Sequence, residues 1–163
     1  MKVSFIVPVK NEENSIAGVV EGIKKCVPAA SEIIVIDDGS TDATAANASA
    51  AGARVISHNI NMGKGCAIRT GIKAASGDVI VFIDGDGQDD PADAAAMLAE
   101  MERGFDFVNG SRFLGILEKG SITTLHRYGN IFMTSLINLL FSSKISDSQA
   151  GFRAVRLDKI RGW

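Results

Sequence analysis

The chain has 163 residues, of which 46% are hydrophobic and 22% charged, and its formal net charge is −2. These values are typical of one globular domain, expected here over residues 1–163, and they give no support to nucleic-acid binding, which usually needs a clustered basic surface. Cys26 and Cys66 lack metal-ligand spacing, and no apolar run approaches the ~20 residues of a membrane span, so reduced cytosolic thiols are expected, without a signal peptide or membrane helix.

Strand and helix patterns alternate along the chain. Apolar, β-branched runs bounded by polar turns predict five strands, at residues 2–9, 32–36, 54–58, 79–83 and 105–109. Helical spacing and end signals predict the helices between them: one capped by Asn14 or Ser15, an alanine-rich one stopping at Gly52, one over 66–75 ended by Gly77, and one with Asp90 as N-cap and Pro91 in its first position. One or two helices are expected over 121–142, and loop and strand over 146–155. The alternation predicts an α/β fold with a mainly parallel sheet.

The stretch after the fourth strand is the richest in groups that could bind a ligand. Asp84 and Asp86 lie on the same side of an extended backbone, and Gln88 adds a neutral oxygen. This all-oxygen set suits Mg²⁺ or Mn²⁺ rather than a soft metal, and Gly85 and Gly87 remove side chains where something must come close. The alternative is a polar turn that only ends the strand, since Asp and Gly are common turn residues.

Three polar segments follow three of the predicted strands, at residues 8–13, 37–42 and 84–90. Because ligands of open α/β sheets bind outside the carboxyl ends of the strands, these segments are expected to meet at one site. Three separate loops that converge are harder to explain as simple turns than one acidic cluster.

Other phosphate-binding patterns fit less well. A dinucleotide fold needs G-x-G-x-x-G after the first strand, where this chain has PVKNEE at 8–13. A P-loop needs G-x-x-x-x-G-K-[ST], whereas Gly63 and Lys64 are followed by Gly65, and position 58 is histidine. An aspartate-nucleophile phosphotransferase, with Asp84 attacking and Asp86 as acid, stays an alternative that the mid-chain position of the acids disfavours.

Six segments in order carry a resemblance to a known family. They are VPVKNEE at 7–13, IDDGSTD at 36–42, NMGKG at 61–65, DGDGQDDP at 84–91, GSRF at 110–113 and DSQAGFR at 147–153. With them the chain resembles the family-2 glycosyltransferases of the GT-A fold, a Rossmann-like nucleotide-sugar-binding architecture. Within that family it is most similar to the polyprenyl (dolichyl) phosphate mannose and glucose synthases.

The resemblance implies a UDP- or GDP-sugar donor, Mg²⁺ or Mn²⁺ on its diphosphate, and hexose transfer with inversion to a polyprenyl or dolichyl phosphate. It implies a cytoplasmic protein, peripheral at the inner face of the plasma membrane. The metal would lie among Asp84, Asp86 and Gln88. The catalytic residues would be Asp86, Arg112, Arg127 and Arg153, with the arginines facing diphosphate or acceptor phosphate. The nucleotide-sugar would be bound by Pro8, Lys10, Glu12, Ile36, Asp37, Asp38, Gly63, Lys64, Asp84 and Gly85.

Elementary chemistry supports several of these roles. Departure of the leaving group puts negative charge on a phosphate, which a metal and fixed cations stabilise. Lys64, between two glycines, could approach either that phosphate or the metal-site acids. A phosphate acceptor is already mostly ionised at neutral pH and needs no general base, and the sequence fixes no role for the acids Asp89, Asp90 and Asp147.

Several alternatives stay open. The segment 121–142 could pack on the sheet or lie at the membrane surface as an amphipathic element. Position 10 is lysine where mannose-synthase relatives commonly carry an aromatic, so base recognition could differ. Because the chain ends ten residues after Arg153, it is expected to be truncated or to lack the usual C-terminal extension. Transfer to a polysaccharide or small hydroxyl acceptor, or a non-catalytic nucleotide-sugar-binding remnant, are the competing functions.

Overall fold

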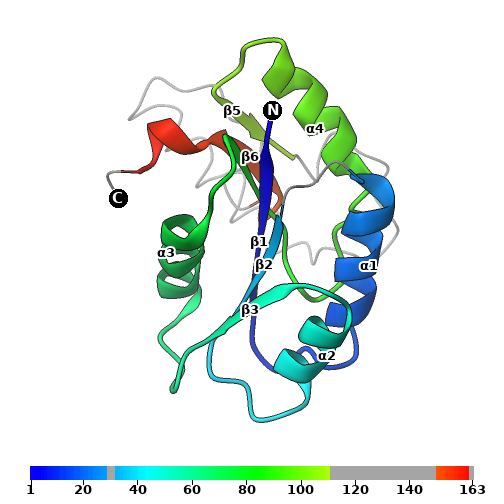
Figure 1. Ribbon diagram of the computed structural model, residues 1–163, viewed down its shortest axis with the longest axis vertical. Coiled ribbons are helices and arrows are strands. Elements are labelled where there is room, and N and C mark those ends of the chain that lie inside the picture. Colours follow the sequence, from blue (N-terminus) through cyan, green and yellow to red (C-terminus); the bar gives the residue numbers. More distant parts are fainter. Residues whose placement is uncertain (29–31, 111–149, 162–163) are drawn as a thin grey trace, which may run out of the picture. The chain divides into compact units, whose positions relative to one another are not determined.

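The computed structural model of the chain describes residues 1–28, 32–110 and 150–161. Contacts within the chain divide it into two compact units, one formed by Met1–Val108 with Phe152–Trp163 and the other by Asn109–Gly151. The first unit is a sheet with helices on both faces (Figure 1). Its elements are β1 (Val3–Val9), α1 (Ile16–Cys26), β2 (Glu32–Asp37), α2 (Thr44–Ala50), β3 (Arg54–Ser57), α3 (Lys64–Ala74), β4 (Val79–Phe82), α4 (Asp93–Glu102), β5 (Phe107–Asn109), β6 (Arg153–Arg156) and the 3-10 turn η1 (Leu157–Lys159). The last residue of β5, Asn109, is counted with the second unit.

The sheet has the strand order β3-β2-β1-β4-β6-β5. The first four strands pair in parallel, and β6 pairs with β4 in the antiparallel direction. The predicted α/β fold with a mainly parallel sheet is therefore confirmed; strand β6 overlaps the segment 146–155, where loop and strand were predicted, but its antiparallel direction was not predicted. The four parallel strands all end at the same side of the sheet, called here the carboxyl edge, and β6 begins there because Arg153 pairs with Phe82.

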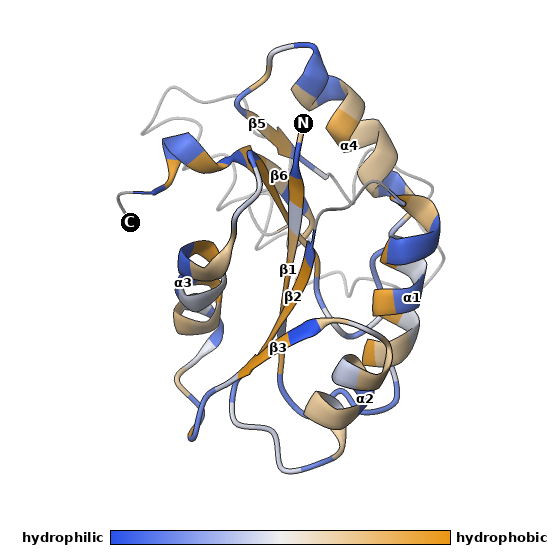
Figure 2. Cartoon of the chain, viewed as in Figure 1, coloured by the Kyte–Doolittle hydropathy of each residue, from blue (hydrophilic) through white to orange (hydrophobic). Residues whose placement is uncertain are grey.

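Two apolar clusters hold the layers together. On one face, apolar side chains of α1, α2 and α4 pack on β1, β2 and β4. On the other face, α3 packs on the alternate residues of the same strands, including Ile36 and Phe82. All four residues of β4 are buried, as expected for a central strand covered on both sides. In Figure 2 the strands are accordingly the most hydrophobic elements.

Element ends differ from the sequence prediction where side chains have other partners. Ser15 is the N-cap of α1, but its hydroxyl donates to the Gly85 carbonyl at 2.7 Å and makes no side-chain capping bond. Helix α4 begins at Asp93 and not at Pro91, because the turn before it is closed by i→i+3 bonds, such as the one from the Asp93 N–H to the Asp90 carbonyl at 3.1 Å. Asp90 Oδ1 still accepts the Ala92 N–H at 2.9 Å, as a capping residue does. Helix α3 ends before Gly77, whose missing side chain lets it lie against Ser4: a Cβ would come 2.7 Å from Ser4 Oγ.

Pro8 lies inside β1, opposite Ile36 of β2, rather than closing the strand. A proline is tolerated there for a geometric reason. The Val9 carbonyl accepts the Asp38 N–H after β2, and the Ile6 carbonyl accepts the Ile83 N–H after β4. Because the polar backbone groups of successive residues point to opposite neighbours, the Pro8 nitrogen points toward β4. The β1–β4 pairing ends at Ile6 with Phe82, so no ladder bond is lost.

The predicted helical segment 121–142 lies outside the described residues. Of the helices in the described ranges, none is both long and apolar enough to cross a bilayer.

Candidate functional site

The three polar segments predicted to converge do meet at the carboxyl edge. The Asp38 N–H donates to the Val9 carbonyl at 2.9 Å, which ties the second segment to the first. The Ser15 hydroxyl bridges the first and third, because it contacts Glu12 Oε2 at 2.9 Å and the Gly85 carbonyl at 2.7 Å. The edge is therefore one site built from separate loops, as ligand sites of open α/β sheets are.

The loops after β1 and β2 are locked together around Asn11. This residue has a φ of 55°, in the left-handed region that asparagine tolerates better than most residues. Its N–H donates to Ser40 Oγ at 2.9 Å, and its side-chain oxygen accepts the Thr41 N–H at 2.9 Å. The Glu12 N–H donates to Thr44 Oγ1 at 2.8 Å. These bonds fix the backbone beside the predicted ligands Lys10 and Glu12.

Asp37 and Asp38 are both buried, and each carboxylate binds the chain's own backbone. Asp37 Oδ1 accepts the Ser40 N–H at 3.0 Å, a local turn bond. Asp38 accepts the N–H groups of Met62 at 2.9 Å and Gly63 at 2.7 Å. Their predicted role as nucleotide ligands stays a prediction, and the structure adds a positioning role for Asp38 toward the loop that precedes α3.

His58 completes the surroundings of Asp38. Its Nδ1 lies 2.7 Å from Asp38 Oδ1 and its Nε2 lies 3.0 Å from Thr70 Oγ1. Burial is the strongest single influence on the pKa of Asp38 and raises it, but hydrogen bonds from His58, Met62 and Gly63 together hold this pKa below its ordinary value. Sequence reasoning missed His58 as a site residue, because a lone histidine after a short strand has no distinctive pattern.

Asp84 forms an ion pair with Lys64, the first residue of α3. The Lys64 ammonium lies 2.6 Å from Asp84 Oδ1 and 2.8 Å from Oδ2, with both side chains partly exposed. Of the two partners considered for Lys64, phosphate or the acids, the structure shows the acid. Nearby, Asp86 Oδ1 accepts the Gln88 N–H at 3.0 Å, and both side chains are exposed at the edge.

The donor set fits a hard divalent cation that is shared with a ligand. Among the described residues, no group of three or more His, Cys, Asp or Glu side chains is placed to enclose a metal. Asp84 and Asp86 supply carboxylate oxygens and Gln88 a carboxamide oxygen. Mg²⁺-type sites commonly use one or two carboxylates, with phosphate oxygens and waters in the other positions. The residues present therefore fit Mg²⁺ or Mn²⁺ bound together with a diphosphate.

Gly85 was predicted to lack a side chain so that another group could come close, and in the structure that group is the Val9 side chain. Gly85 is buried, and a Cβ there would lie 2.2 Å from Val9 Cγ1. The packing of the loop on β1 thus explains the absence of a side chain at this position, and the role of Gly85 in nucleotide-sugar binding stays a prediction. Gly87, by contrast, has a φ of 78°, which glycine adopts without strain.

Arg153 lies at the same edge, on the face covered by α3. Arg153 pairs with Phe82, the last residue of β4, which lies two residues before Asp84 in the sequence. Phe82 and Val155 pack in the cluster with α3, and Arg153 shares their side of the sheet by alternation. Lys64 and Arg153 therefore bring two cations to one corner of the carboxyl edge. Arg112 and Arg127 lie outside the described residues.

The other predicted donor ligands differ in accessibility. Lys10 is exposed, and Glu12 and Pro8 are half-buried. Ile36 is fully buried in the cluster with α3, so its side chain is part of the core. Gly63 is the N-cap of α3, with a φ of 88°, and its N–H is already bonded to Asp38.

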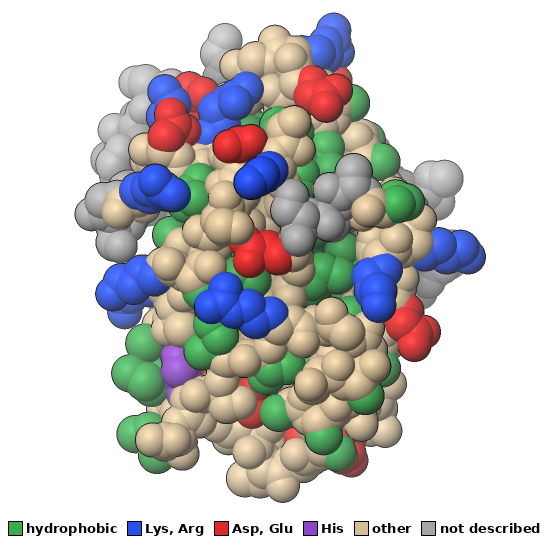
Figure 3. All heavy atoms as spheres, viewed as in Figure 1, with side chains coloured by type: hydrophobic (Ala, Val, Ile, Leu, Met, Phe, Trp, Pro, Cys, Tyr) green, Lys and Arg blue, Asp and Glu red, His purple; other side chains and the backbone are tan. Residues whose placement is uncertain are grey.

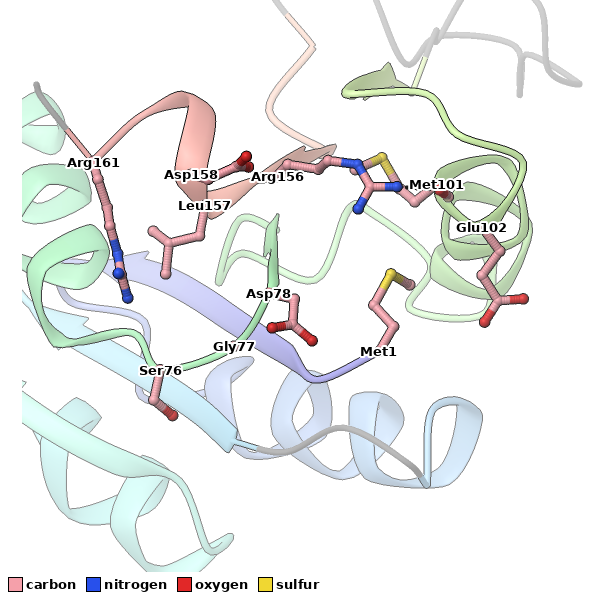
Figure 4. Close-up of a pocket in the computed structure, with 10 residues that line it drawn as sticks. All are labelled: Met1, Ser76, Gly77, Asp78, Met101, Glu102, Arg156, Leu157, Asp158 and Arg161. Carbon is pink, nitrogen blue, oxygen red and sulfur yellow. Dashed lines mark hydrogen bonds between the residues drawn. The ribbon is translucent and has the colours of Figure 1, made fainter.

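A pocket of about 620 Å³ lies at the opposite edge of the sheet, where β4 begins and β6 ends (Figure 4). Two of its polar side chains make hydrogen bonds that hold the fold together. Asp78 accepts the Lys2 N–H at 2.8 Å, and Arg156 donates to the Met101 carbonyl at 2.9 Å. None of the predicted site residues lines this pocket, so we place the candidate site at the carboxyl edge on its chemistry.

Comparison with known proteins matches this chemistry to a family. The profile of Glycosyl transferase family 2 matches residues 4–162. The chain is 38% identical over 112 residues to the dodecaprenyl-phosphate galacturonate synthase of Rhizobium johnstonii, covering 63% of this chain and 33% of that protein. It is 32% identical over 153 residues to the glycosyltransferase AglJ of Haloferax volcanii, covering 93% of this chain and 49% of that protein. The chain thus spans half or less of the length of these two relatives.

A solved structure shares the architecture. Glucosyl-3-phosphoglycerate synthase from Mycobacterium tuberculosis, crystallised with Mn²⁺, UDP-glucose and phosphoglyceric acid, superposes with a TM-score of 0.76 at 27% identity. The match covers 96% of this chain and 57% of that one. The mostly parallel six-stranded sheet with flanking helices is therefore the fold of that enzyme over the shared part.

Proposed function

The chain belongs to glycosyltransferase family 2, and from this membership we propose that it moves a hexose from a UDP- or GDP-sugar to a polyprenyl phosphate, with inversion and with the help of Mg²⁺ or Mn²⁺. The observation that carries the proposal is the grouping of Asp84, Asp86, Lys64 and Arg153 at the carboxyl edge. Residues 1–163 would act as one catalytic domain, peripheral at the cytoplasmic face of the membrane.

The donor would lie along the carboxyl edge. Its base and ribose are assigned to the loops that follow β1 and β2, near Pro8, Lys10, Glu12 and Asp38, and its diphosphate to the corner between Lys64 and Asp84. Two things support this orientation. Carboxylates accept hydrogen bonds from sugar hydroxyls and base N–H groups, and the related synthase was crystallised with Mn²⁺ and UDP-glucose.

The reaction needs negative charge to be stabilised on the departing diphosphate. A divalent metal bound by Asp84, Asp86 and Gln88 would supply Lewis-acid stabilisation of that charge. Lys64 and Arg153 would add fixed positive charge at the same corner, and guanidinium groups suit the paired oxygens of a phosphate. Arg112 and Arg127 are proposed to face the diphosphate or the acceptor phosphate.

Positive charge at the site comes from individual side chains. On the face drawn in Figure 3, acidic and basic side chains of the described residues lie interspersed rather than gathered by sign. Because salt also screens exposed charges beyond about 10 Å, we expect attraction of an anionic donor to depend mainly on short-range contacts with cations such as Lys64.

The acceptor proposed first is a lipid phosphate. A phosphate nucleophile is already ionised near neutral pH and needs no general base. This agrees with the site, where the carboxylates of Asp37, Asp38 and Asp84 accept hydrogen bonds from backbone N–H groups or form an ion pair with Lys64. The relative named as a dodecaprenyl-phosphate galacturonate synthase supports this choice. A small acidic acceptor is the second candidate, supported by the similarity to glucosyl-3-phosphoglycerate synthase.

The test is a transfer assay with the whole chain. UDP-glucose, GDP-mannose and UDP-GlcNAc are each incubated with Mn²⁺ and either a polyprenyl phosphate, phosphoglyceric acid or an oligosaccharide. Transfer to the lipid phosphate is the expected result. Transfer only to a hydroxyl acceptor would replace the main proposal by its alternative, and donor binding without turnover on any acceptor would identify a binding remnant.

A further inference from the structure

The cation nearest the predicted metal ligands is part of the protein. Lys64 Nζ contacts both oxygens of Asp84, at 2.6 and 2.8 Å. An ammonium held this close uses about two of the roughly four lone-pair positions of the carboxylate and repels a second cation there. A metal ion that binds Asp84 therefore competes with Lys64 for these oxygens and weakens or opens the ion pair.

The position of Lys64 is set by a buried clamp rather than by the ion pair alone. Asp38 accepts the N–H groups of Met62 and Gly63, the two residues directly before Lys64, and the pair with His58 holds Asp38 in turn. The backbone at the start of α3 is therefore fixed. The Lys64 side chain is still partly exposed, with 54% of its surface accessible, so it can turn without moving the helix.

We propose that Lys64 is an exchangeable counter-ion of the metal site: it neutralises Asp84 in the donor-free protein and transfers to the donor diphosphate when the metal takes its place. This inference rests on the proposed function. The charges of Lys64, the metal ion and the diphosphate favour binding of the metal together with the nucleotide. A metal that arrives alone competes with the ammonium for Asp84 and brings no anion that could take the place of Asp84 beside Lys64. A metal that arrives with a diphosphate gives Lys64 a new anion within reach.

The consequence is a coupling between metal and nucleotide. Two ligands that each improve the other's binding share a coupling free energy, and the effect is reciprocal. Lys64 would contribute to it by penalising metal binding without nucleotide and favouring metal binding with nucleotide. The pair thereby suppresses capture of free metal ions and favours binding of the complete metal–donor complex.

A rival arrangement uses the same contact differently. Lys64 could replace the metal permanently, with the ammonium bridging Asp84 and the diphosphate. Donor binding would then need no divalent ion, and removal of the ammonium would abolish it. The two arrangements predict opposite effects of Lys64 on the affinity for a metal alone.

The experiment compares the whole chain with Lys64→Met and with the control Lys73→Met. Lys73 is an exposed lysine of the same helix, nine residues further along, so its substitution removes the same charge from α3 away from Asp84. Circular dichroism and thermal melting check folding. Binding of Mn²⁺ is titrated at low salt by the electron paramagnetic resonance of free Mn²⁺, first without nucleotide and then with UDP or GDP. UDP and GDP binding is titrated with and without Mn²⁺.

Lys64→Met is expected to bind Mn²⁺ alone about two- to five-fold more tightly than the unchanged chain, the range for losing an exposed ion pair. In the presence of Mn²⁺ it is expected to bind the nucleoside diphosphate about tenfold more weakly, since a charge-assisted contact to phosphate is lost. Lys73→Met should change neither value. The gain in Mn²⁺ affinity should shrink as salt is added, because the pair is exposed.

Unchanged or weaker Mn²⁺ binding by Lys64→Met would overturn the counter-ion proposal, as would Mn²⁺ binding too weak to detect in both proteins. Nucleotide binding that needs no metal and is lost in Lys64→Met would establish the rival arrangement. Failure of the proposed function looks different: the unchanged chain would then bind neither nucleoside diphosphate with Mn²⁺, whatever Lys64→Met does to Mn²⁺ alone.

Discussion

Asp86 is the residue whose substitution tests the metal assignment with the least disturbance of the fold. Its side chain is exposed, and its one described bond is to the N–H of Gln88. We expect Asp86→Ala to lower Mn²⁺-dependent binding of the donor by at least about tenfold, because one of two carboxylate ligands is lost. Calorimetric titration with UDP-sugar and GDP-sugar measures it. Asp93→Ala, which removes an exposed acid from α4, is the control. Equal donor affinity in both variants would show that Asp86 binds no metal.

Asp38 makes the stability of the fold depend on acid pH. Its pKa in the folded protein is lowered, because the hydrogen bonds from His58, Met62 and Gly63 outweigh the effect of burial. The ionised form therefore stabilises the fold at pH values above the ordinary pKa of about 3.9, and this contribution is lost as the pH falls through the lower folded-state pKa.

Asp38→Asn should consequently be less stable than the unchanged chain by a constant amount between pH 5 and 7, with the gap closing below about pH 4. Urea unfolding at pH 7 and pH 3 gives the two free energies of unfolding. A gap of the same size at both pH values would mean that the Asp38 carboxylate is not preferentially bonded in its ionised form.

At the residue level, sequence patterns predicted the acids of the site better than their partners. Asp84 and Asp86 were placed at a strand end by the apolar run before them, and the structure puts them there. Lys64 was assigned two possible partners: the structure shows its contact with Asp84, and its contact with a phosphate stays a prediction. His58 and Ser15 bond to residues 20 and 70 positions away. Such contacts leave no local pattern, because they are set by the way the loops meet in space.

At the scale of elements, the loop after β4 depends on how closely it packs against β1. A methyl group at Gly85 would lie 2.2 Å from Val9 Cγ1. We expect Gly85→Ala to lower the free energy of unfolding by about 1–3 kcal/mol, the usual cost of overpacking. Gly18→Ala is the control: this glycine faces open space in α1, where alanine should stabilise the helix by up to about 1 kcal/mol. Chemical denaturation of both variants gives the comparison, and an unaffected Gly85→Ala would contradict the packing.

Ser4 joins three elements at the start of the sheet. It is fully buried, its hydroxyl donates to Glu32 Oε1 at 2.7 Å, and it accepts the Gly77 N–H at 2.8 Å. Ser4→Ala leaves that N–H and part of Glu32 without a partner, so a loss of about 1–3 kcal/mol in the free energy of unfolding is expected. Ser49→Ala, at an exposed position of α2, should stay within about 0.5 kcal/mol. Equal stability of the two variants in urea would contradict this role of Ser4.

Element types were predictable, but their ends were less so. Long apolar runs and helical spacing identified every strand and helix of the described part up to β5. The N-cap of α1 is Ser15, one of the two residues predicted, whereas α4 begins at Asp93, two residues later than predicted. The antiparallel β6 follows a segment of 39 residues outside the described ranges, and no local signal gives the direction in which such a chain returns.

At the scale of the whole molecule, hydrogen exchange can distinguish donor binding at the carboxyl edge of the sheet from donor binding in the pocket at the opposite edge. With Mn²⁺ and UDP or GDP, hydrogen exchange should slow in residues 8–13, 37–42, 59–65 and 84–90 of the carboxyl edge. The opposite pocket, lined by Ser76, Asp78 and Arg156, should exchange at the same rate with and without ligand. Protection confined to that pocket would contradict the placement of the donor site.

The return of the chain to the sheet has one further consequence. Strands β5 and β6 are neighbours, and the Arg156 N–H donates to the Asp106 carbonyl, so the end of β6 meets the start of β5. Strand β5 ends at Asn109 and β6 begins at Arg153, so the chain leaves the sheet at one strand and returns to it at the neighbouring one. Doubling a flexible connection costs only about 0.6 kcal/mol. We therefore expect a change in the length of the chain between these two strands to have little effect on their pairing in the sheet.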